Sequence, residues 1–169
     1  TDENGCTYAP QTTTISVSAP ILLDLEITDV LCHGLCTGSA VLGISGGSSP
    51  LFYHWEYDSV VWQTNHPEAL NLCAGDYTVT VIDMFECEGL GSFTISQPDT
   101  ILINTFSGSP SCYGYTDGYV YLEVHGGNPF DDGLGNTYYE YEWSTIGTGS
   151  DSIAIGGGYH FVTVTDANN

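Results

Sequence analysis

Short stretches of the chain alternate apolar and polar residues with a period of two. Residues 76–82 and 118–124 show this most clearly, with Tyr, Val or Leu at every second position. Alternation of this kind is typical of strands that bury one face. Turn-forming Gly, Asn, Asp and Pro separate the stretches, and no segment has the capped 3.6-residue period of a helix. The pattern predicts an all-β protein, and the lack of crossover helices disfavours a single parallel sheet.

One ordered set of motifs occurs twice. The sequence CHGLCTG at 32–38 matches CYGYTDG at 112–118, an offset of 80 residues. Further matches follow in the same order: Gly46-Gly47 with Gly126-Gly127, Tyr53-His54-Trp55 with Tyr141-Glu142-Trp143, and 79–83 with 162–166. Self-similarity at a fixed spacing indicates two copies of roughly 80 residues. The second copy has a longer loop around residues 130–136.

The number of strands in each copy predicts its architecture. Seven or so short strands, with a Trp on a central strand, are typical of an immunoglobulin-like sandwich. We expect two tandem immunoglobulin-like β-sandwich domains, residues 20–98 and 99–169. Residues 1–19 are expected to be the closing strand of a preceding or neighbouring repeat, because Cys6 follows Asp2 at the spacing by which Cys87 follows Asp83. The second domain then lacks a closing strand of its own.

Two arrangements explain this phasing, and both stay open. The chain is either a window on a longer array, which its start at Thr1 without an initiator Met favours, or a subunit whose N-terminal strand completes the second domain of a neighbour. An unpaired edge strand promotes association. We therefore expect self-association, between adjacent repeats or between head-to-tail neighbours.

The charge of the chain excludes several functions. Its 169 residues include 21 acidic side chains, 5 His and no Lys or Arg, which gives a formal net charge of −21. Nucleic-acid binding depends on Lys and Arg and is excluded. No apolar run approaches the ~20 residues that span a bilayer, so we expect no membrane insertion. Six Cys without paired Cys-x-x-Cys motifs favour disulfides over zinc, which predicts an extracellular or cell-surface location.

The two copies differ in their cysteines, and the difference predicts the pairing. Two cysteines of the first copy are missing together from the second, where Thr116 and Gly156 stand, so these two are expected to bond to each other. The pairing of the other four cysteines follows by elimination and from the positions at which each copy begins and ends along the chain. The predicted pairs are Cys36 with Cys73, Cys32 with Cys87, and Cys6 with Cys112 of a neighbour.

The ordered motifs also carry a family resemblance. They are Cys-x-Gly-x-x-Thr/Asp-Gly, Gly-Gly, Tyr-x-Trp, Gly-x-Tyr-x-Val-x-Val-x-Asp and a final Asn-Gly-Cys, and they cover nearly the whole chain. This set resembles the tandem repeats of the SprB-type gliding-motility adhesins and related giant surface proteins of Bacteroidetes. The resemblance implies an exported, non-enzymatic array of immunoglobulin-like or PKD-like domains at the cell surface. The chain departs from the pattern at Met84-Phe85-Glu86, where the family has an Asn-Gly turn.

The same resemblance implies covalent O-glycans. Three tripeptides match the Asp-Ser/Thr-aliphatic pattern that resembles the O-glycosylation motif of Bacteroidetes. About one such match is expected by chance in a chain of this composition, so the enrichment is modest. The implied glycosylation sites are Ser59, Thr100 and Ser152.

Catalytic motifs are absent from the sequence, which contains no Gly-x-Ser-x-Gly elbow, His-Glu-x-x-His helix or phosphate loop. Glu140 and Glu142 share one strand face and could form a glycosidase pair, but solvent exposure explains their spacing equally simply. The histidines lack the spacing of metal ligands. They are His33, His54, His66, His125 and His160. We expect no enzyme and no required cofactor.

Calcium is the one metal for which the sequence offers candidate ligands. Asp131, Asp132 and Asn136 in the long loop, and Asp166 near the end, supply oxygen atoms at short spacing. The alternative is an Asx turn, in which Asp166 and its counterpart Asp83 accept backbone N–H groups. Both interpretations stay open.

Two functions remain. The first is a structural repeat segment of an extracellular bacterial surface adhesin or filament, stabilised by disulfides and assembling head to tail. The second is a carbohydrate-binding or docking module of a secreted multidomain protein, which would bind surface polysaccharide through exposed aromatic side chains. Trp62 and Tyr138 have no counterpart in the other copy and are the best candidates for such contacts.

Overall fold

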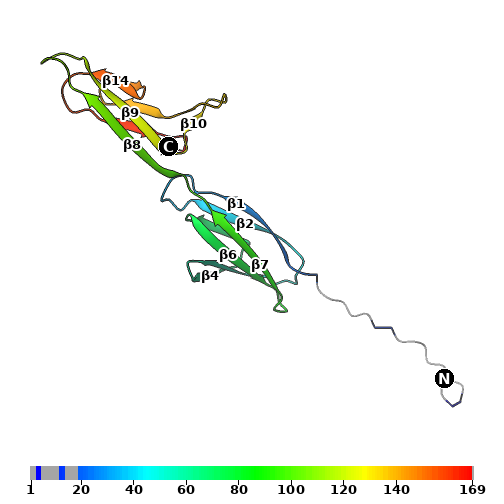
Figure 1. The fold of residues 1–169 in the computed structure, drawn as a ribbon. Coiled ribbons are helices and arrows are strands. Elements are labelled where there is room, and N and C mark those ends of the chain that lie inside the picture. The colour runs from blue at the N-terminus through cyan, green and yellow to red at the C-terminus, as the bar shows by residue number, and fades with distance from the viewer. Residues whose placement is uncertain (1–2, 5–11, 14–18, 169) are drawn as a thin grey trace.

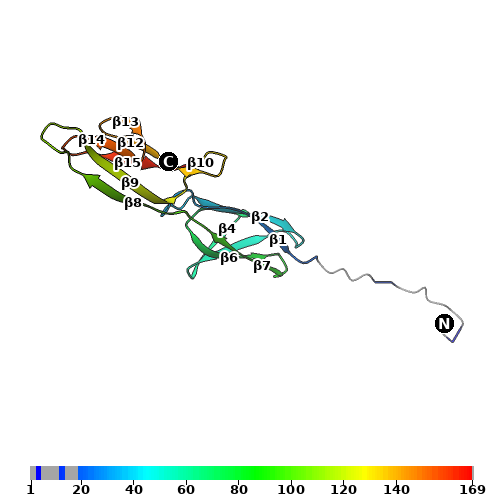
Figure 2. The same cartoon turned by 45° about the horizontal axis from the view of Figure 1, so that its top comes forward.

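The computed structural model describes residues 3–4, 12–13 and 19–168. Across this part of the chain all regular structure is β, in fifteen strands, so the predicted fold class is confirmed. Figure 1 shows the strands in two groups that lie end to end, and Figure 2 shows the same arrangement from another side. We call residues 19–98, with β1–β7, the N-terminal half, and residues 99–168, with β8–β15, the C-terminal half.

The N-terminal half is a sandwich of two antiparallel sheets. One sheet has the order β1-β2-β5, with bounds Leu22–Thr28, Gly38–Ser45 and Glu68–Leu72. The other has the order β4-β3-β6-β7, with bounds Val60–Thr64, Phe52–Tyr57, Gly75–Ile82 and Glu88–Ile95. These orders match strands A-B-E and C′-C-F-G of an immunoglobulin-like sandwich.

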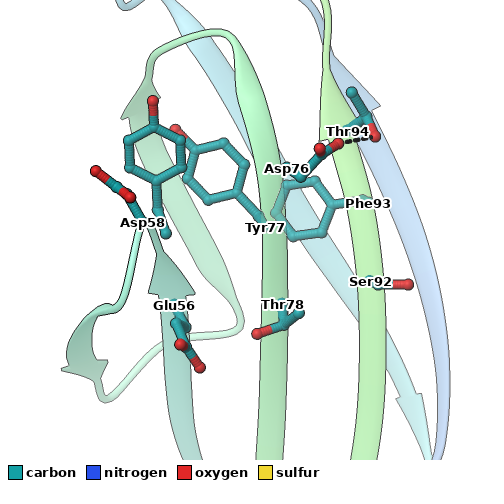
Figure 3. A pocket seen from close by; sticks show the side chains of 9 residues that line it. Glu56, Asp58, Asp76, Tyr77, Thr78, Ser92, Phe93 and Thr94 are labelled. Carbon is teal, nitrogen blue, oxygen red and sulfur yellow. Dashed lines mark hydrogen bonds between the residues drawn. The ribbon is translucent and has the colours of Figure 1, made fainter.

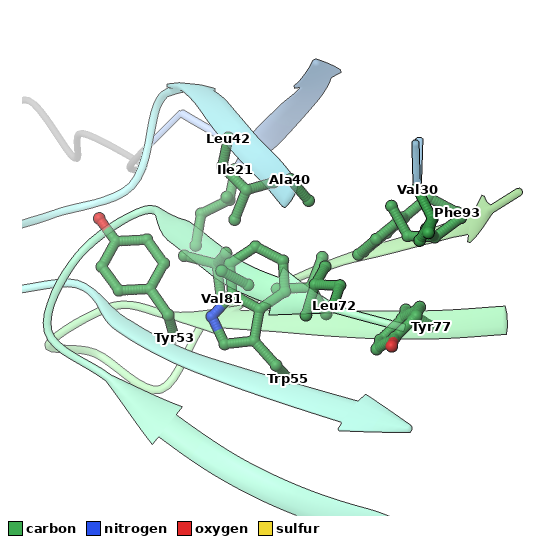
Figure 4. Close-up of a cluster of buried hydrophobic side chains, with 13 residues drawn as sticks. Ile21, Val30, Ala40, Leu42, Tyr53, Trp55, Leu72, Tyr77, Val81 and Phe93 are labelled. Atoms are coloured by element: carbon green, nitrogen blue, oxygen red, sulfur yellow. The ribbon is translucent and has the colours of Figure 1, made fainter. Parts of the chain in front are cut away.

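Alternate residues of these strands meet between the sheets. Trp55 on β3 and Val79 and Val81 on β6 have no exposed surface, as the period-two pattern predicts. The indole nitrogen of Trp55 is also satisfied, because it donates to Thr64 Oγ1 at 3.1 Å. Figure 4 shows the surrounding cluster of apolar side chains, which come from both sheets.

The C-terminal half has the same strand order as β1–β6, and no strand among its described residues corresponds to β7. Its sheets are β14-β9-β8, with bounds Ser152–Ile155, Gly118–Gly127 and Asp99–Gly108, and β13-β12-β15, with bounds Gly147–Gly149, Glu140–Trp143 and Val162–Thr165. The long loop contains a short hairpin of β10 (Phe130–Asp131) and β11 (Thr137–Tyr138). Within the described residues, β15 pairs with β12 alone, whereas β6 in the other half pairs with β3 and β7.

The predicted domain boundary at 98/99 falls where residues 96–98 connect β7 directly to β8. The predicted closing strand, residues 1–19, lies almost entirely outside the described residues. Among the residues that are described, no helix is long and apolar enough to cross a membrane.

Candidate functional site

A disulfide joins Cys36 to Cys73, as predicted. Cys36 precedes β2 and Cys73 follows β5, and these strands pair so that Gly38 lies opposite Leu72. The bond therefore ties the ends of two adjacent strands in one sheet. The simultaneous loss of both cysteines from the second copy was a sufficient signal for this pair.

The predicted pair of Cys32 with Cys87 is wrong, because both cysteines are free. Cys87 lies immediately before β7, whereas the segment with Cys32 is fixed to the residues just after β7: Val30 N–H donates to Ser96 O at 2.9 Å. The eight residues of β7 separate the two ends by about 26 Å at ~3.3 Å per residue. A disulfide requires Cα atoms within about 7 Å of each other.

The remaining predicted pair is Cys6 with Cys112 of a neighbour. Cys112 is free and exposed in a loop at the end of the C-terminal half. Cys6 lies outside the described residues, so this pair stays a prediction.

The loops that carry Cys32 and Cys112 share a backbone hydrogen bond and a glycine conformation. Leu35 N–H donates to Cys32 O at 3.2 Å, and its counterpart Tyr115 N–H donates to Cys112 O at 3.1 Å. The glycine between them has a positive φ in both loops, 75° at Gly34 and 82° at Gly114, a conformation that favours glycine. The two cysteines therefore occupy equivalent positions, in the loop between β1 and β2 and in the loop between β8 and β9. Figure 1 shows the first loop at the junction between the halves and the second at the far end of the C-terminal half.

Two buried carboxylates organise equivalent turns. Asp83 Oδ2 accepts from Ser48 N–H at 3.1 Å, and Asp166 Oδ2 accepts from Asn128 N–H at 2.8 Å. The Oδ1 atoms accept from the N–H two residues later, Phe85 at 2.8 Å and Asn168 at 3.0 Å. These are the Asx turns expected as the alternative to calcium at Asp166.

Asp83 also fixes the turn that carries Cys87. Its Oδ1 accepts from Cys87 N–H at 2.9 Å, and its own N–H donates to Cys87 O at 3.0 Å. Backbone hydrogen bonds, that from Cys87 first, lower the pKa of Asp83 below its usual value, against the opposing effect of burial. The side chain is only 2% exposed, so the ionised carboxylate acts as an internal acceptor for the turn.

The junction between the halves is formed by backbone and amide groups. Asn168 Nδ2 donates to Leu31 O, which connects the Asp166 turn to the residue before Cys32. His33 Nδ1 lies 3.1 Å from Pro98 O, and Gly34 N–H donates to Gln97 Oε1 at 2.9 Å, so the same loop also contacts the connecting segment. A pocket of about 500 Å³ lies between these groups.

A second pocket, of about 480 Å³, lies on the β3-β6-β7 face of the N-terminal half (Figure 3). Three rings stack along it: Tyr57 on Tyr77 with centroids 4.6 Å apart, and Tyr77 on Phe93 at 5.3 Å. Burial, first among its causes, raises the pKa of Tyr77, whose hydroxyl donates to Cys73 O at 2.9 Å. Carboxylates of Glu56, Asp58 and Asp76 line the rim. The sequence interpretation did not identify this stack, although the alternation of β6 already placed Tyr77 on the inner face.

The candidate calcium ligands of the long loop bond to their own backbone. Asp131 Oδ1 accepts from Gly133 N–H at 2.7 Å, and Asp132 Oδ1 accepts from Leu134 N–H at 2.7 Å. Asn136 Nδ2 donates to Asp132 Oδ2 at 2.8 Å, and this bond is the first cause of the lowered pKa of Asp132. Asp166 belongs to the separate turn described above. No metal-holding group of three or more His, Cys, Asp or Glu was found in the described part of the chain, and calcium binding stays a prediction.

The remaining candidates are dispersed. The three implied glycosylation hydroxyls are all exposed: Ser59 in the β3–β4 turn, Thr100 on β8 and Ser152 on β14. Glu140 and Glu142 are exposed on one face of β12. Trp62 packs edge-on against Tyr77, partly buried, whereas Tyr138 is 47% exposed.

The histidines occupy different environments. His33 contacts the connecting segment, and His160 lies 3.0 Å from Gly156 O. His54 Nδ1 is buried without a hydrogen-bond partner. His66 and His125 are exposed.

Comparison with known proteins adds no assignment: no family model and no curated protein matches the chain.

Proposed function

We propose that this chain is a structural segment of an extracellular bacterial surface adhesin or filament, in which sandwich units follow one another head to tail. The observation that carries the proposal is the junction between the halves. A connection of three residues, 96–98, joins β7 to β8, and the Asn168–Leu31 hydrogen bond holds the two halves together beside it. A short connection with contacts on both sides favours an extended arrangement over one in which the halves fold back on each other.

The chemistry of the chain supports the same proposal. A net charge of −21 without Lys or Arg makes like-charged segments repel and therefore extend. The Cys36–Cys73 disulfide suits a location outside the cytosol. No group in this proposal acts as a catalyst, and the activity of the segment is to space and display whatever adjoins it.

Electron microscopy of the full chain tests this proposal. We expect rods that lengthen in steps of one chain as the protein concentration rises, with added salt promoting growth by screening the charge. Small-angle scattering of the dilute chain should give the elongated profile of two sandwiches end to end. Compact particles at every concentration and salt level would contradict the proposal.

Intact mass spectrometry of material from the native source tests the implied glycans, which would add mass at Ser59, Thr100 or Ser152.

A carbohydrate-binding module is the second candidate, and the aromatic pocket of the N-terminal half favours it. The partly exposed ring of Tyr57 lies beside Glu56 and Asp76, with the buried Tyr77 stacked behind it. It combines an apolar surface with hydrogen-bond acceptors, which is a common way to bind sugars. A glycan array separates the two functions: binding that Tyr57→Ala abolishes and Tyr138→Ala leaves unchanged would favour the pocket. Absence of binding, with rods present, would leave the structural function alone.

A further inference from the structure

Among the described residues, the outer end of each half carries apolar side chains that are largely exposed. At the far end of the C-terminal half, the distal loop (residues 109–116) exposes Tyr113 completely and Tyr115 by 57%. A hollow of about 720 Å³ lies between this loop and Gly156. At the opposite end of the molecule, the Asp83 turn (residues 83–87) exposes Phe85 by 64%.

These two ends are the counterparts of the two surfaces that already meet at the junction. The distal loop corresponds to the loop around Cys32 and has the same backbone hydrogen bond, from Tyr115 N–H to Cys112 O. The Asp83 turn corresponds to the Asp166 turn and has the same carboxylate contacts. Within the chain, the loop around Cys32 accepts the Asp166 turn through Leu31 and Asn168.

The charges of the two ends permit their approach. No ion pair with Lys or Arg can hold two copies of this chain together, since neither residue occurs in it. The Asp83 turn has one exposed carboxylate, that of Glu86, because the carboxylate of Asp83 is buried. The distal loop, residues 109–116, contains no charged residue, so Glu86 meets no like charge within it. Apolar contact is therefore available without placing two carboxylates against each other.

We propose that the distal loop of one chain docks the Asp83 turn of a second copy, in the geometry of the internal junction, and that Cys112 forms a disulfide with the partner's Cys87 instead of the pair with a neighbour's Cys6 that the sequence predicts. This inference rests on the proposed function and deepens it, because it names the surface and the bond by which segments join. In the internal junction the third residue of the turn contacts the residue before Cys32. By equivalence Phe85 lies beside Ser111, where its ring makes apolar contact in place of the hydrogen bond that Asn168 donates. Cys87, two residues further and within about 7 Å of chain, then reaches Cys112. Both thiols are exposed and free.

The bond forms by thiol–disulfide exchange with a small disulfide oxidant such as glutathione disulfide. The Cys112 thiolate attacks one sulfur of the oxidant and releases one glutathione thiolate, which takes up a proton. The partner's Cys87 thiolate then attacks the Cys112 sulfur of the mixed disulfide and releases the second glutathione. Two protein thiols are oxidised to one disulfide, and one glutathione disulfide is reduced to two thiols.

Complementary variants test the proposal. The starting protein is the full chain with Cys6→Ser and Cys32→Ser, which removes the other two thiols and retains the Cys36–Cys73 bond. Incubation with glutathione disulfide should give a ladder of multimers on a non-reducing gel that collapses on reduction. Adding Cys112→Ser or Cys87→Ser should leave each protein monomeric. Mixing these two proteins should restore a dimer and nothing larger, because each supplies one of the two required thiols.

Two further measurements make every outcome decisive. Peptic digestion at low pH, needed because trypsin has no site, should give a peptide pair that links Cys87 to Cys112. A control protein with Cys87→Ser and Ser59→Cys carries an exposed thiol away from the Asp83 turn. It is mixed with the Cys112→Ser protein. The amount of dimer must not exceed that formed by the same mixture with Ser59 intact. Dimerisation of either single variant alone would show a symmetric contact and overturn the proposal, as would a monomeric mixture. If the mixture stays monomeric but microscopy shows rods in reductant, the disulfide is overturned and the proposed function is not. If neither rods nor disulfide-linked dimers form, the proposed function is overturned as well.

Discussion

The two halves share their strand order but differ in how much apolar surface they bury. In the N-terminal half thirteen apolar residues are buried in one cluster. In the C-terminal half, among the described residues, only Leu122 and Trp143 reach the same burial. Phe106 on β8 and Phe161 beside β15 remain 49% and 73% exposed. Equal topology therefore does not give equal cores.

The difference follows from the strand that completes the four-stranded sheet. β7 pairs along the whole of β6 and brings Phe93 and Ile95 into the core, at 7% and 1% exposure. β15 pairs with β12 alone in the described part of the chain, so no side chains arrive from that edge. The comparison shows that the seventh strand contributes a large part of the core of such a sandwich, besides closing its edge.

Removal of the central Trp from each half should give the largest contrast. Trp55→Ala should destabilise the N-terminal half by about 3–5 kcal/mol, because its indole is fully buried among side chains that cannot collapse onto the space. Trp143→Ala should cost less, because fewer buried side chains surround it. Differential scanning calorimetry, with one transition for each half, measures both losses. Trp62→Phe is the control, and equal losses for the two central substitutions would contradict the comparison.

Removal of the disulfide should affect one half only. Cys36→Ala with Cys73→Ala opens a bond that spans 37 residues, which should cost about 2–4 kcal/mol. The lower transition, assigned to the C-terminal half, should not move. Cys32→Ala with Cys87→Ala is the matched control, because these thiols are free in the same half. A fall in both transitions would mean that the halves unfold as one unit.

The missing disulfide can also be introduced into the C-terminal half. Thr116 and Gly156 occupy the equivalent positions, and a Cβ placed on Gly156 would lie 3.6 Å from Thr116 Cγ2, so side chains at the two positions come into contact, as the cysteines of a disulfide must. Thr116→Cys with Gly156→Cys should therefore bond and raise the stability of this half by about 2 kcal/mol.

Non-reducing mass spectrometry and calorimetry measure the bond and its effect. Each single variant is the control, since one cysteine alone cannot form the bond. A bond that forms without raising the transition would show that the C-terminal half is not limited by chain entropy.

The sequence was sufficient to predict the features that depend on local pattern. Alternation in residues such as Val79 and Val81 predicted the strands and the inner face, and the paired loss of Cys36 and Cys73 predicted the disulfide. It failed for Cys32 with Cys87, because elimination among cysteines contains no information on which end of a strand each one occupies. The position of Cys87 before β7, and of the Cys32 loop beside the residues after it, depends on strand direction in the folded sheet.

The candidate site shows the same limit. The turn around Asp83 was anticipated because an Asx turn is local, with partners two and four residues away. The Leu31–Asn168 contact spans 137 positions and depends on how the two halves meet. The alternation of apolar and polar residues contains no information on that arrangement. The stack of Tyr57 on Tyr77 likewise arises from the β3–β6 register, in which these two residues lie directly opposite each other.

The smallest effect should come from a titratable hydrogen-bond acceptor that differs between the equivalent loops. Ser111 N–H donates to Asp117 Oδ1 at 3.0 Å, where the counterpart Leu31 N–H donates to Thr37 Oγ1 at 3.2 Å. Ser111, through its hydroxyl first and its N–H second, lowers the pKa of Asp117 below the usual 3.8. The stabilisation of the distal loop by this carboxylate is therefore complete above pH 3.8 and is lost as the pH falls through the lower folded pKa.

The amide resonance of Ser111 measures this difference directly. Between about pH 5 and pH 2 it should shift in the natural chain, because protonation removes the charged acceptor. In Asp117→Thr it should stay fixed, since the hydroxyl keeps the hydrogen bond but does not titrate, as in the N-terminal half. Ser111→Ala is the control: loss of the hydroxyl contact should raise the pKa of Asp117 towards its usual value. An identical titration of the amide in the natural chain and in Asp117→Thr would show that a group other than Asp117 controls the environment of the distal loop.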